Sequence, residues 1–156
     1  MRRRHRERGF TIAEMITVVV IIGILSTLAL PVARYGIRRQ KEIELRHRIR
    51  MITNGIDRYY DLRVAGQIAE QQNIDQGNYP KDLEELVEGA DLVTGEHVRF
   101  IRDRDLIDPM TGKKEWDTRS STDDPESYFT DGANVFDVRS KSTRLSLDGE
   151  TRYNEW

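Results

Sequence analysis

Apolar and polar positions along the chain fall into three patterns. Residues 10–30, FTIAEMITVVVIIGILSTLAL, form an almost unbroken apolar run with one acid, Glu14, near its start. Further on, apolar residues recur every three or four positions, the spacing of one helix face: Leu45, Ile49, Ile52, Ile56 and Tyr59. After Gly66 the apolar stretches are short and separated by turn residues. These patterns predict one long helix over residues 10–65, followed by a small mixed region.

The apolar run is long enough to cross a bilayer once. At about 1.5 Å per residue, 21 helical residues rise roughly 31 Å, the thickness of the hydrocarbon core. Residues 2–8 hold five arginines, so the positive-inside tendency places the N-terminus in the cytoplasm. Four basic residues on the other flank weaken this assignment: Arg34, Arg38, Arg39 and Lys41. A carboxylate such as Glu14 costs roughly 2.5–3.5 kcal/mol in hydrocarbon, so its presence needs a reason.

Two simple explanations of the apolar run stay open at this point. The first is an ordinary secretory signal, cut near the sequence TLALPVA, although an acid inside the apolar region argues against it. The second is a plain signal anchor whose Glu14 faces a partner helix.

A third explanation comes from the order of residues around Glu14. A basic leader ends in Gly9 and is followed by Phe10, Glu14, sixteen uncharged residues and Pro31. This order resembles the class III signal of type IV pilins and type II secretion pseudopilins. The resemblance implies that a prepilin peptidase cuts between Gly9 and Phe10 and methylates the new amine of Phe10. It also implies an assembly role for Glu14, whose carboxylate would neutralise the Phe10 amine of a neighbouring subunit and fix the axial register.

The helix continues beyond Pro31, which lacks an N–H donor and is expected to kink it. Gly36 and Gly55 are expected weak points, each costing about 1 kcal/mol relative to alanine. Spacings of four residues predict surface ion pairs from Glu42 to Arg46 and from Glu44 to Arg48.

The remaining segments predict a short helix and a small antiparallel β-sheet. PKDLEELVEGA, from Pro80, has Leu83 and Leu86 on one helical face and Gly89 near its end. HVRFIR, KEWD, YFTD and NVFDVRS read as short strands, and DPMTGK reads as a turn. The expected core or sheet-face aromatic residues are Trp116, Tyr128 and Phe136. The predicted fold is therefore α+β, with the sheet packed on the apolar stripe of the long helix.

Four segments extend the resemblance beyond the N-terminus. NYPKDLEELVE, LIDPMTGKKEW, VFDVRS and LDGETRYNEW occur in the same order as in the major pseudopilin of type II secretion systems and its close relatives. The resemblance implies a pilin-like fold with these parts: a leader (1–9), a transmembrane or filament-core helix half (10–31), an amphipathic helix half (32–66) and a periplasmic globular part packed on 32–66 (67–156). The lack of cysteine agrees with this resemblance, because many true type IV pilins close a C-terminal loop with a disulfide.

The C-terminal region departs from this family in one respect. Major pseudopilins usually bind calcium in a loop rich in glycine and aspartate, and calcium needs six to eight oxygen ligands. The matching stretch, SKSTRLSLDGETRYNEW, has only Asp148 and Glu150 before its last residues, with Lys141 and Arg144 among them. Asp148 is the candidate calcium ligand, but a simple turn at Asp148 and Gly149 is the favoured interpretation.

Composition and motifs narrow the chemistry further. From Gln67 onward there are eleven basic and twenty-one acidic residues, which disfavours nucleic-acid binding, and basic residues near the anchor are expected to contact lipid headgroups. His5, His47 and His97 lack metal-ligand spacing, and DRDLIDP lacks the glycine and glutamate of an EF-hand. No phosphate-binding or nucleophile motif occurs. The sequence predicts no enzyme and no required cofactor.

The leading functional hypothesis is a structural pseudopilin of a type II secretion system. It would be a single-pass inner-membrane protein with a periplasmic C-terminal part, polymerised into a periplasmic filament. The expected partners are further copies of itself, prepilin peptidase, the inner-membrane assembly platform, minor pseudopilins and the membrane. The alternatives are a subunit of a type IV pilus or DNA-uptake filament, a membrane-anchored adaptor that does not polymerise, and an anchored enzyme.

Overall fold

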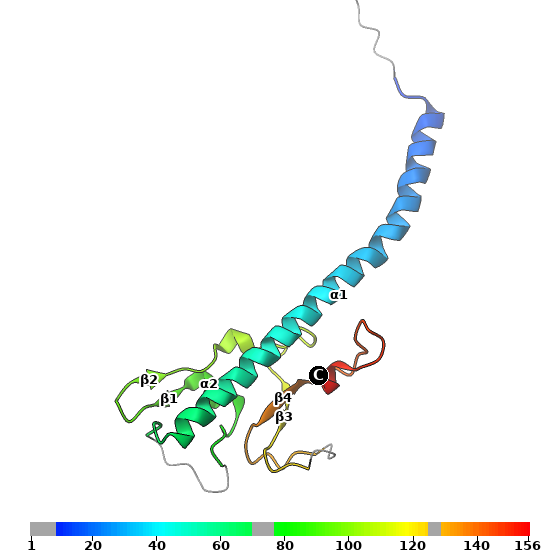
Figure 1. Cartoon of the computed structure of the whole chain (residues 1–156). Coiled ribbons are helices and arrows are strands. Elements are labelled where there is room, and N and C mark those ends of the chain that lie inside the picture. The colour runs from blue at the N-terminus through cyan, green and yellow to red at the C-terminus, as the bar shows by residue number, and fades with distance from the viewer. Residues whose placement is uncertain (1–8, 70–76, 125–128) are drawn as a thin grey trace, which may run out of the picture. The chain divides into compact units, whose positions relative to one another are not determined.

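The computed structural model describes residues 9–69, 77–124 and 129–156. Its elements in chain order are α1 (Ile12–Val64), α2 (Leu83–Glu88), β1 (Ala90–Asp91), β2 (His97–Val98), the 3-10 helix η2 (Asp103–Leu106), β3 (Trp116–Arg119), β4 (Asp137–Ser140) and the 3-10 helix η3 (Tyr153–Glu155) (Figure 1). The predicted α+β class is confirmed. The chain divides into two compact units, Met1–Arg39 and Gln40–Trp156, and α1 contributes to both.

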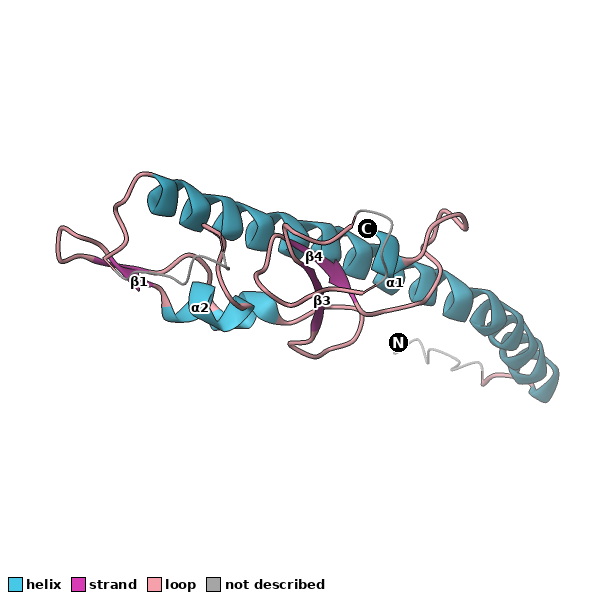
Figure 2. Ribbon diagram, turned by 90° about the horizontal axis from the view of Figure 1, so that it is seen from below, coloured by secondary structure: helices cyan, strands magenta, loops and turns pink. Residues whose placement is uncertain are grey.

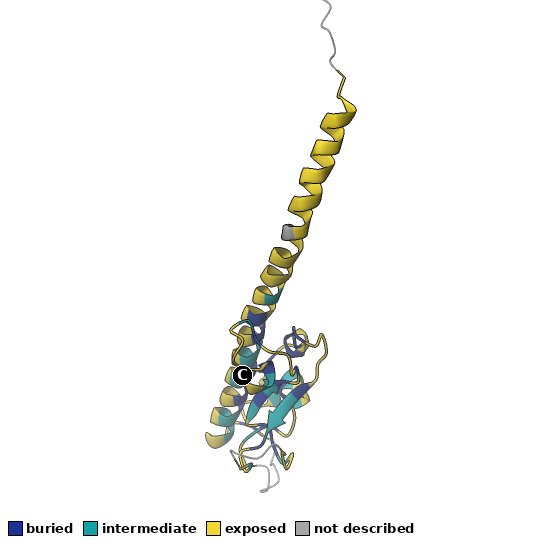
Figure 3. Cartoon of the chain, turned by 90° about the vertical axis from the view of Figure 1, so that its right-hand side faces the viewer, coloured by how far each residue is buried: buried dark blue, intermediate teal, exposed yellow. Residues whose placement is uncertain are grey.

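In the first unit, α1 exposes apolar side chains around its whole circumference. Ile12, Val19 and Leu30 are all more than half exposed. Figure 3 shows this part of the helix in the colour of exposed residues. The helix continues through Pro31, and the kink expected at this residue stays a prediction.

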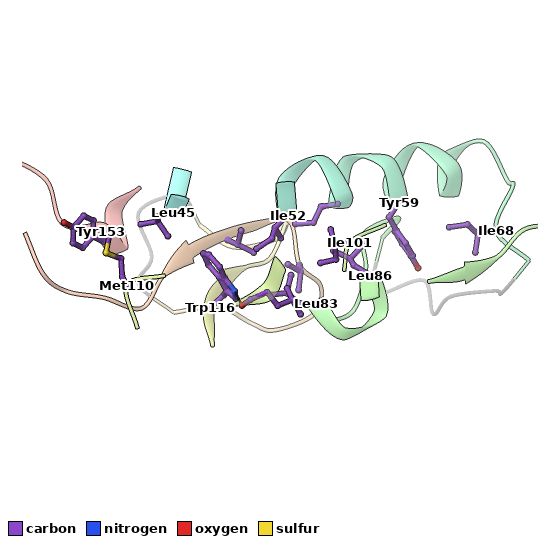
Figure 4. Packing of buried hydrophobic residues seen from close by; sticks show 14 residues of the cluster. Leu45, Ile52, Tyr59, Ile68, Leu83, Leu86, Ile101, Met110, Trp116 and Tyr153 are labelled. Carbon is purple, nitrogen blue, oxygen red and sulfur yellow. Dashed lines mark hydrogen bonds between the residues drawn. The ribbon is translucent and has the colours of Figure 1, made fainter. Parts of the chain in front are cut away.

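In the second unit, the predicted stripe of α1 forms one wall of the core. Leu45, Ile52 and Tyr59 are buried on one side of the core (Figure 4). Ile56 is also fully buried, and the partly buried Ile49 packs against this cluster. The opposite wall comes from α2, η2, β3, β4, η3 and the segments that connect them, through Leu83, Leu86, Ile101, Leu106, Met110, Trp116, Val135, Val138 and Tyr153. Burying one large aliphatic or aromatic side chain contributes about 1.5–3 kcal/mol, so this stripe is a major source of stability.

The predicted short helix is present as α2. Its N-terminus is capped by Asp82, whose side chain accepts a hydrogen bond from Glu85 N at 2.9 Å. Gly89 ends the helix with a φ of 90°, and a Cβ built there would lie 2.4 Å from the Val98 carbonyl oxygen. Glycine is required at this position because the backbone of β2 passes so close.

The strands are antiparallel, as predicted, but they form two sheets instead of the one sheet that was predicted. β1 pairs antiparallel with β2, matching Ala90 with Val98, and β3 pairs antiparallel with β4, matching Trp116 with Ser140. These are two separate two-stranded sheets instead of one. Figure 2 shows both pairs alongside the second part of α1.

Three predictions about individual segments need correction or comment. Residues 129–131 of YFTD form no strand, and Tyr128 lies outside the described residues. Trp116 is buried as predicted, but Phe136 is 48% exposed. Phe136 lies just before β4 begins at Asp137, and its neighbours Val135 and Val138 fill the core instead.

Candidate processing and assembly site

The peptide bond between Gly9 and Phe10 lies in the non-helical segment before α1. A Cβ built on Gly9 would meet no atom within 4 Å, and Phe10 is 73% exposed. A peptidase must bind backbone groups that a helix would otherwise engage in its own hydrogen bonds. Because α1 begins at Ile12, this peptide bond is open to such an enzyme.

Glu14 lies in the first turn of α1. Its backbone N–H donates to Thr11 Oγ1 at 3.2 Å, so Thr11 caps the helix. A carboxylate here also interacts favourably with the helix dipole, by about 0.3–1 kcal/mol. That gain is smaller than the roughly 2.5–3.5 kcal/mol cost of a carboxylate in hydrocarbon. The local position of Glu14 therefore does not explain its presence in an apolar segment.

Other polar side chains of this segment are satisfied by their own helix. Hydroxyl groups donate to backbone carbonyls one turn earlier, from Thr17 to Ala13 at 2.9 Å, from Ser26 to Ile22 at 2.8 Å and from Thr27 to Ile24 at 2.7 Å. The Glu14 carboxylate, in contrast, has no hydrogen-bond or ion-pair partner among residues 9–69, 77–124 and 129–156. Among the described residues, Glu14 thus differs from Thr17, Ser26 and Thr27 in having no partner for its side chain.

The part of the chain that the structure describes has one helix, α1, long and apolar enough to cross a membrane. None of its most apolar window is buried, so this segment is not the core helix of a soluble domain. An N-terminal signal sequence can have the same length and composition as a membrane-spanning helix. The sequence motif around Glu14 is therefore needed to distinguish a signal sequence from a membrane anchor.

Comparison with known proteins identifies that motif. Residues 4–30 match the family model described as the prokaryotic N-terminal methylation motif. Searches of curated proteins and of solved structures each gave no significant match. The matched range contains Gly9, Phe10 and Glu14, and it supports a type IV pilin-like protein with a prepilin signal. Motif and apolar helix together fit a single-pass, membrane-anchored substrate of prepilin peptidase that polymerises like a pilin.

Asp148, the candidate calcium ligand, lies in a tight loop of the second unit. Its carboxylate accepts hydrogen bonds from the Ser146 hydroxyl, from Glu150 N at 2.9 Å, and from the N–H and hydroxyl of Thr151, each at 3.2 Å. The Ser146 hydroxyl, followed by the two backbone N–H groups, lowers the pKa of Asp148 to about 2.

The Asp148 carboxylate is engaged by donors of its own loop. Each Asp148 oxygen already faces hydroxyl or N–H donors, whereas calcium requires several oxygens directed at one point. Within the described ranges, no group of three or more His, Cys, Asp or Glu side chains is arranged to hold a metal.

Glu42 has a role that the sequence did not indicate. It is only 9% exposed, and its Oε1 accepts hydrogen bonds from Leu147 N at 2.7 Å and from the Tyr153 hydroxyl at 2.8 Å. It therefore holds the C-terminal segment against α1 within the second unit. The spacing of residues along the helix gave no signal for this role, because the partners of Glu42 are 105 and 111 residues away.

Only one of the two predicted helix ion pairs is confirmed. Arg48 contacts Glu44 at 3.2 Å and also pairs with the buried Asp105. Arg46 does not pair with Glu42, whose carboxylate is already engaged, and instead stacks on the Trp156 ring at 4.3 Å from the ring centroid.

Proposed function

We propose that this chain is the major subunit of the periplasmic filament of a type II protein secretion system. Its leader, residues 1–9, would be removed by prepilin peptidase, the Phe10 amine would be methylated, and copies would be polymerised by the inner-membrane assembly platform together with minor pseudopilins. The methylation motif supports processing and pilin-like polymerisation. The order of the C-terminal segments supports the secretion system over a pilus or DNA-uptake filament.

The observation that carries this proposal is the Glu14 carboxylate, which lies in an exposed apolar helix and has no partner in the part of the chain that the structure describes. Cleavage after Gly9 creates a second group of the opposite charge, the Phe10 amine. Glu14 and Phe10 are four positions apart in one chain. If the apolar helices of two neighbouring subunits pack side by side with an axial offset of four residues, the Glu14 carboxylate of one lies beside the Phe10 amine of the other. A buried ion pair adds little net stability, but leaving one partner alone costs about 3–5 kcal/mol. The pair therefore selects one register of assembly.

The proposed role is structural. The activity of the chain is polymerisation, and we propose that it needs neither a catalytic residue nor a bound cofactor. Energy for assembly would come from a separate ATPase of the secretion machinery.

Processing provides the direct test of this proposal. Protein purified from its own membrane should have an N-terminal Phe10 carrying one methyl group, measured by intact mass and N-terminal peptide sequencing. Gly9→Val should block cleavage and leave the precursor, because the peptidase site would have to accept a branched side chain. A mature terminus near Ala29 or Ala33 would instead establish an ordinary signal peptide and contradict the proposal.

A deletion experiment tests the finer assignment. Removing the gene from its host should abolish secretion of folded exported proteins and leave surface pili intact. Loss of surface pili with normal secretion would assign the chain to a pilus.

A further inference from the structure

A groove of about 870 Å³ lies in the second unit, between α1 and the segment that follows β2. Its apolar surface includes Met51 on α1 and Phe100. Pockets that hold small molecules have volumes of roughly 300–1,000 Å³ and combine an apolar lining with a few polar groups. The rim of this groove has four arginines and two aspartates: Arg48, Arg99, Arg102, Arg104, Asp103 and Asp105. We call this feature the basic groove.

The arginines of the basic groove outnumber their partners. Arg48 is paired with Asp105, and the second aspartate of the rim is engaged by Lys114 at 2.5 Å. Arg99 and Arg102 are exposed, and neither forms an ion pair with another described residue. The rim therefore has two positive charges in excess, on a part of the chain whose overall charge is negative.

One buried donor of a groove residue has no acceptor. The guanidinium group of Arg48 donates through Nη1 to Asp105 and through Nη2 to Glu44 Oε1 at 3.2 Å. Its Nε is buried and has no hydrogen-bond partner among the residues that the structure describes. Buried N–H groups are normally paired, because an unpaired one loses its hydration without compensation. We therefore expect the acceptor for Arg48 Nε to come from a molecule that enters the groove.

The charges and the apolar surface together indicate the class of ligand. Guanidinium groups bind oxyanions such as carboxylate and phosphate through paired N–H donors. A phosphate monoester carries about 1.5–2 negative charges at neutral pH, which matches the two positive charges in excess, whereas a carboxylate carries one. An apolar group on the ester would cover Met51 and Phe100 and remove them from water. These features favour a phosphate monoester over a free inorganic anion.

We propose that the basic groove binds a small, soluble phosphate monoester that carries an apolar group. The phosphate oxygens accept hydrogen bonds from Arg48 Nε and from the guanidinium groups of Arg99 and Arg102, and the apolar group lies over Met51 and Phe100. This inference goes beyond the proposed function, because the groove can bind such a molecule whether or not the chain polymerises.

Calorimetric titration of the full chain with phenyl phosphate tests this site, because the probe is soluble and has one apolar ring. The chain is held in nanodiscs of phosphatidylcholine, whose headgroup has no net charge, and empty nanodiscs provide the blank. Phenyl phosphate should bind with a dissociation constant below about 1 mM. It should bind roughly tenfold more tightly than inorganic phosphate, which lacks the apolar group, and more tightly than benzoate, which has one negative charge.

Substitutions at the rim locate the binding site. Arg99→Gln and Arg102→Gln should each weaken binding of phenyl phosphate by roughly tenfold, because each removes a charge-assisted hydrogen bond. Both side chains are exposed, so these variants should fold normally. Arg48→Lys should have a similar effect, because lysine keeps the charge beside Asp105 but has no Nε donor. The matched controls are Arg139→Gln and Arg139→Lys on β4, outside the groove, and they should bind like the natural chain.

Four results would overturn the site. Absence of binding up to millimolar phenyl phosphate would do so, and equal affinity for inorganic phosphate would show an adventitious ion only. Unchanged affinity of both Arg99→Gln and Arg102→Gln would place the probe elsewhere. Loss of binding when phosphatidic acid replaces part of the phosphatidylcholine would assign the groove to a lipid headgroup instead. None of these results depends on filaments, so the proposed function is tested separately.

Discussion

Gly55 lowers the helix propensity of α1 but allows close packing in the core. Helix propensity alone makes it a weak point of α1, by about 1 kcal/mol relative to alanine. In the structure, however, a Cβ built on Gly55 would lie 2.7 Å from Ile101 Cγ2. Ile101 is buried in the core of the second unit, so this close approach lets its segment pack directly on the helix.

Gly55→Ala should therefore destabilise the protein. Overpacking costs about 1–3 kcal/mol, which exceeds the gain in helix propensity. The matched control is Gly36→Ala, where a Cβ would meet nothing within 4 Å and the free energy of unfolding should stay equal or rise. Chemical denaturation of the detergent-solubilised full chain measures both. Equal stabilisation by the two substitutions would contradict the packing role of Gly55.

Among the elements, the short pair of strands β1 and β2 depends on a titratable side chain. His97 Nδ1 lies 2.7 Å from an Asp91 carboxylate oxygen across the pair, and its Nε2 lies 2.9 Å from the Glu88 carbonyl at the end of α2. Hydrogen bonding to Asp91, followed by that to Glu88, raises the pKa of His97. The protonated ring thus connects both strands to the helix before them.

This connection predicts a pH dependence of stability. Because the folded-state pKa of His97 is raised, its contribution is fully present below the unfolded value of about 6.5 and is lost as pH rises through the folded value. Unfolding midpoints of the natural chain should fall between pH 6 and pH 8 by more than those of His97→Gln. NMR titration of the ring checks the direction of the shift, and a His97 pKa below its ordinary value would contradict this account.

Elements differed in how well the sequence predicted them. The stripe of α1 is a local signal, and so are Leu83 and Leu86 of α2 with Gly89 at its end, so both helices were predicted. Strands of two to four residues carry little local signal, and their partners are chosen by packing, which explains the two sheets and the exposed Phe136. At the candidate site, Gly9, Phe10 and Glu14 lie within six residues of one another and form a local pattern that can be identified directly. The burial of Glu42 could not be predicted, because its partners are more than a hundred residues away.

At the scale of the whole molecule, side chains of the second unit hold its C-terminal segment in place through hydrogen bonds and a cation–π contact. Asp148 organises the loop, Glu42 attaches it to α1, and Trp156 donates to Thr151 at 3.0 Å while stacking against Arg46. From the sequence alone, the Asp148 carboxylate could either bind a cation or accept hydrogen bonds from Ser146, Glu150 and Thr151, because both would use the same oxygens.

Calcium should therefore leave stability unchanged. Neither excess calcium nor a chelator should shift the melting temperature of the full chain, whereas Asp148→Asn should lower it. Because the pKa of Asp148 is depressed to about 2, the contribution of its carboxylate is present above pH 4 and is lost as pH falls through about 2. A rise of several degrees in the melting temperature on adding calcium would contradict this account of the Asp148 loop.

In the first unit, we propose that assembly depends on Glu14, whose carboxylate has no hydrogen-bond or ion-pair partner among the described residues. Thr17 provides a matched control, since its hydroxyl already donates to Ala13 at 2.9 Å. Replacing Thr17 by valine should leave assembly unchanged. Replacing Glu14 by aspartate should have an intermediate effect, because the carboxylate is then one methylene shorter.

Filament imaging of Glu14→Leu is the most direct test of the account. Leucine removes a group that costs roughly 2.5–3.5 kcal/mol in hydrocarbon, so membrane insertion and cleavage after Gly9 should be normal or improved. Filaments should nevertheless be absent or rare, because every subunit would bury an unpaired Phe10 amine and lose the cue for register. Filaments of natural number and length from Glu14→Leu, with normal protein abundance, would contradict the pairing of Glu14 with Phe10.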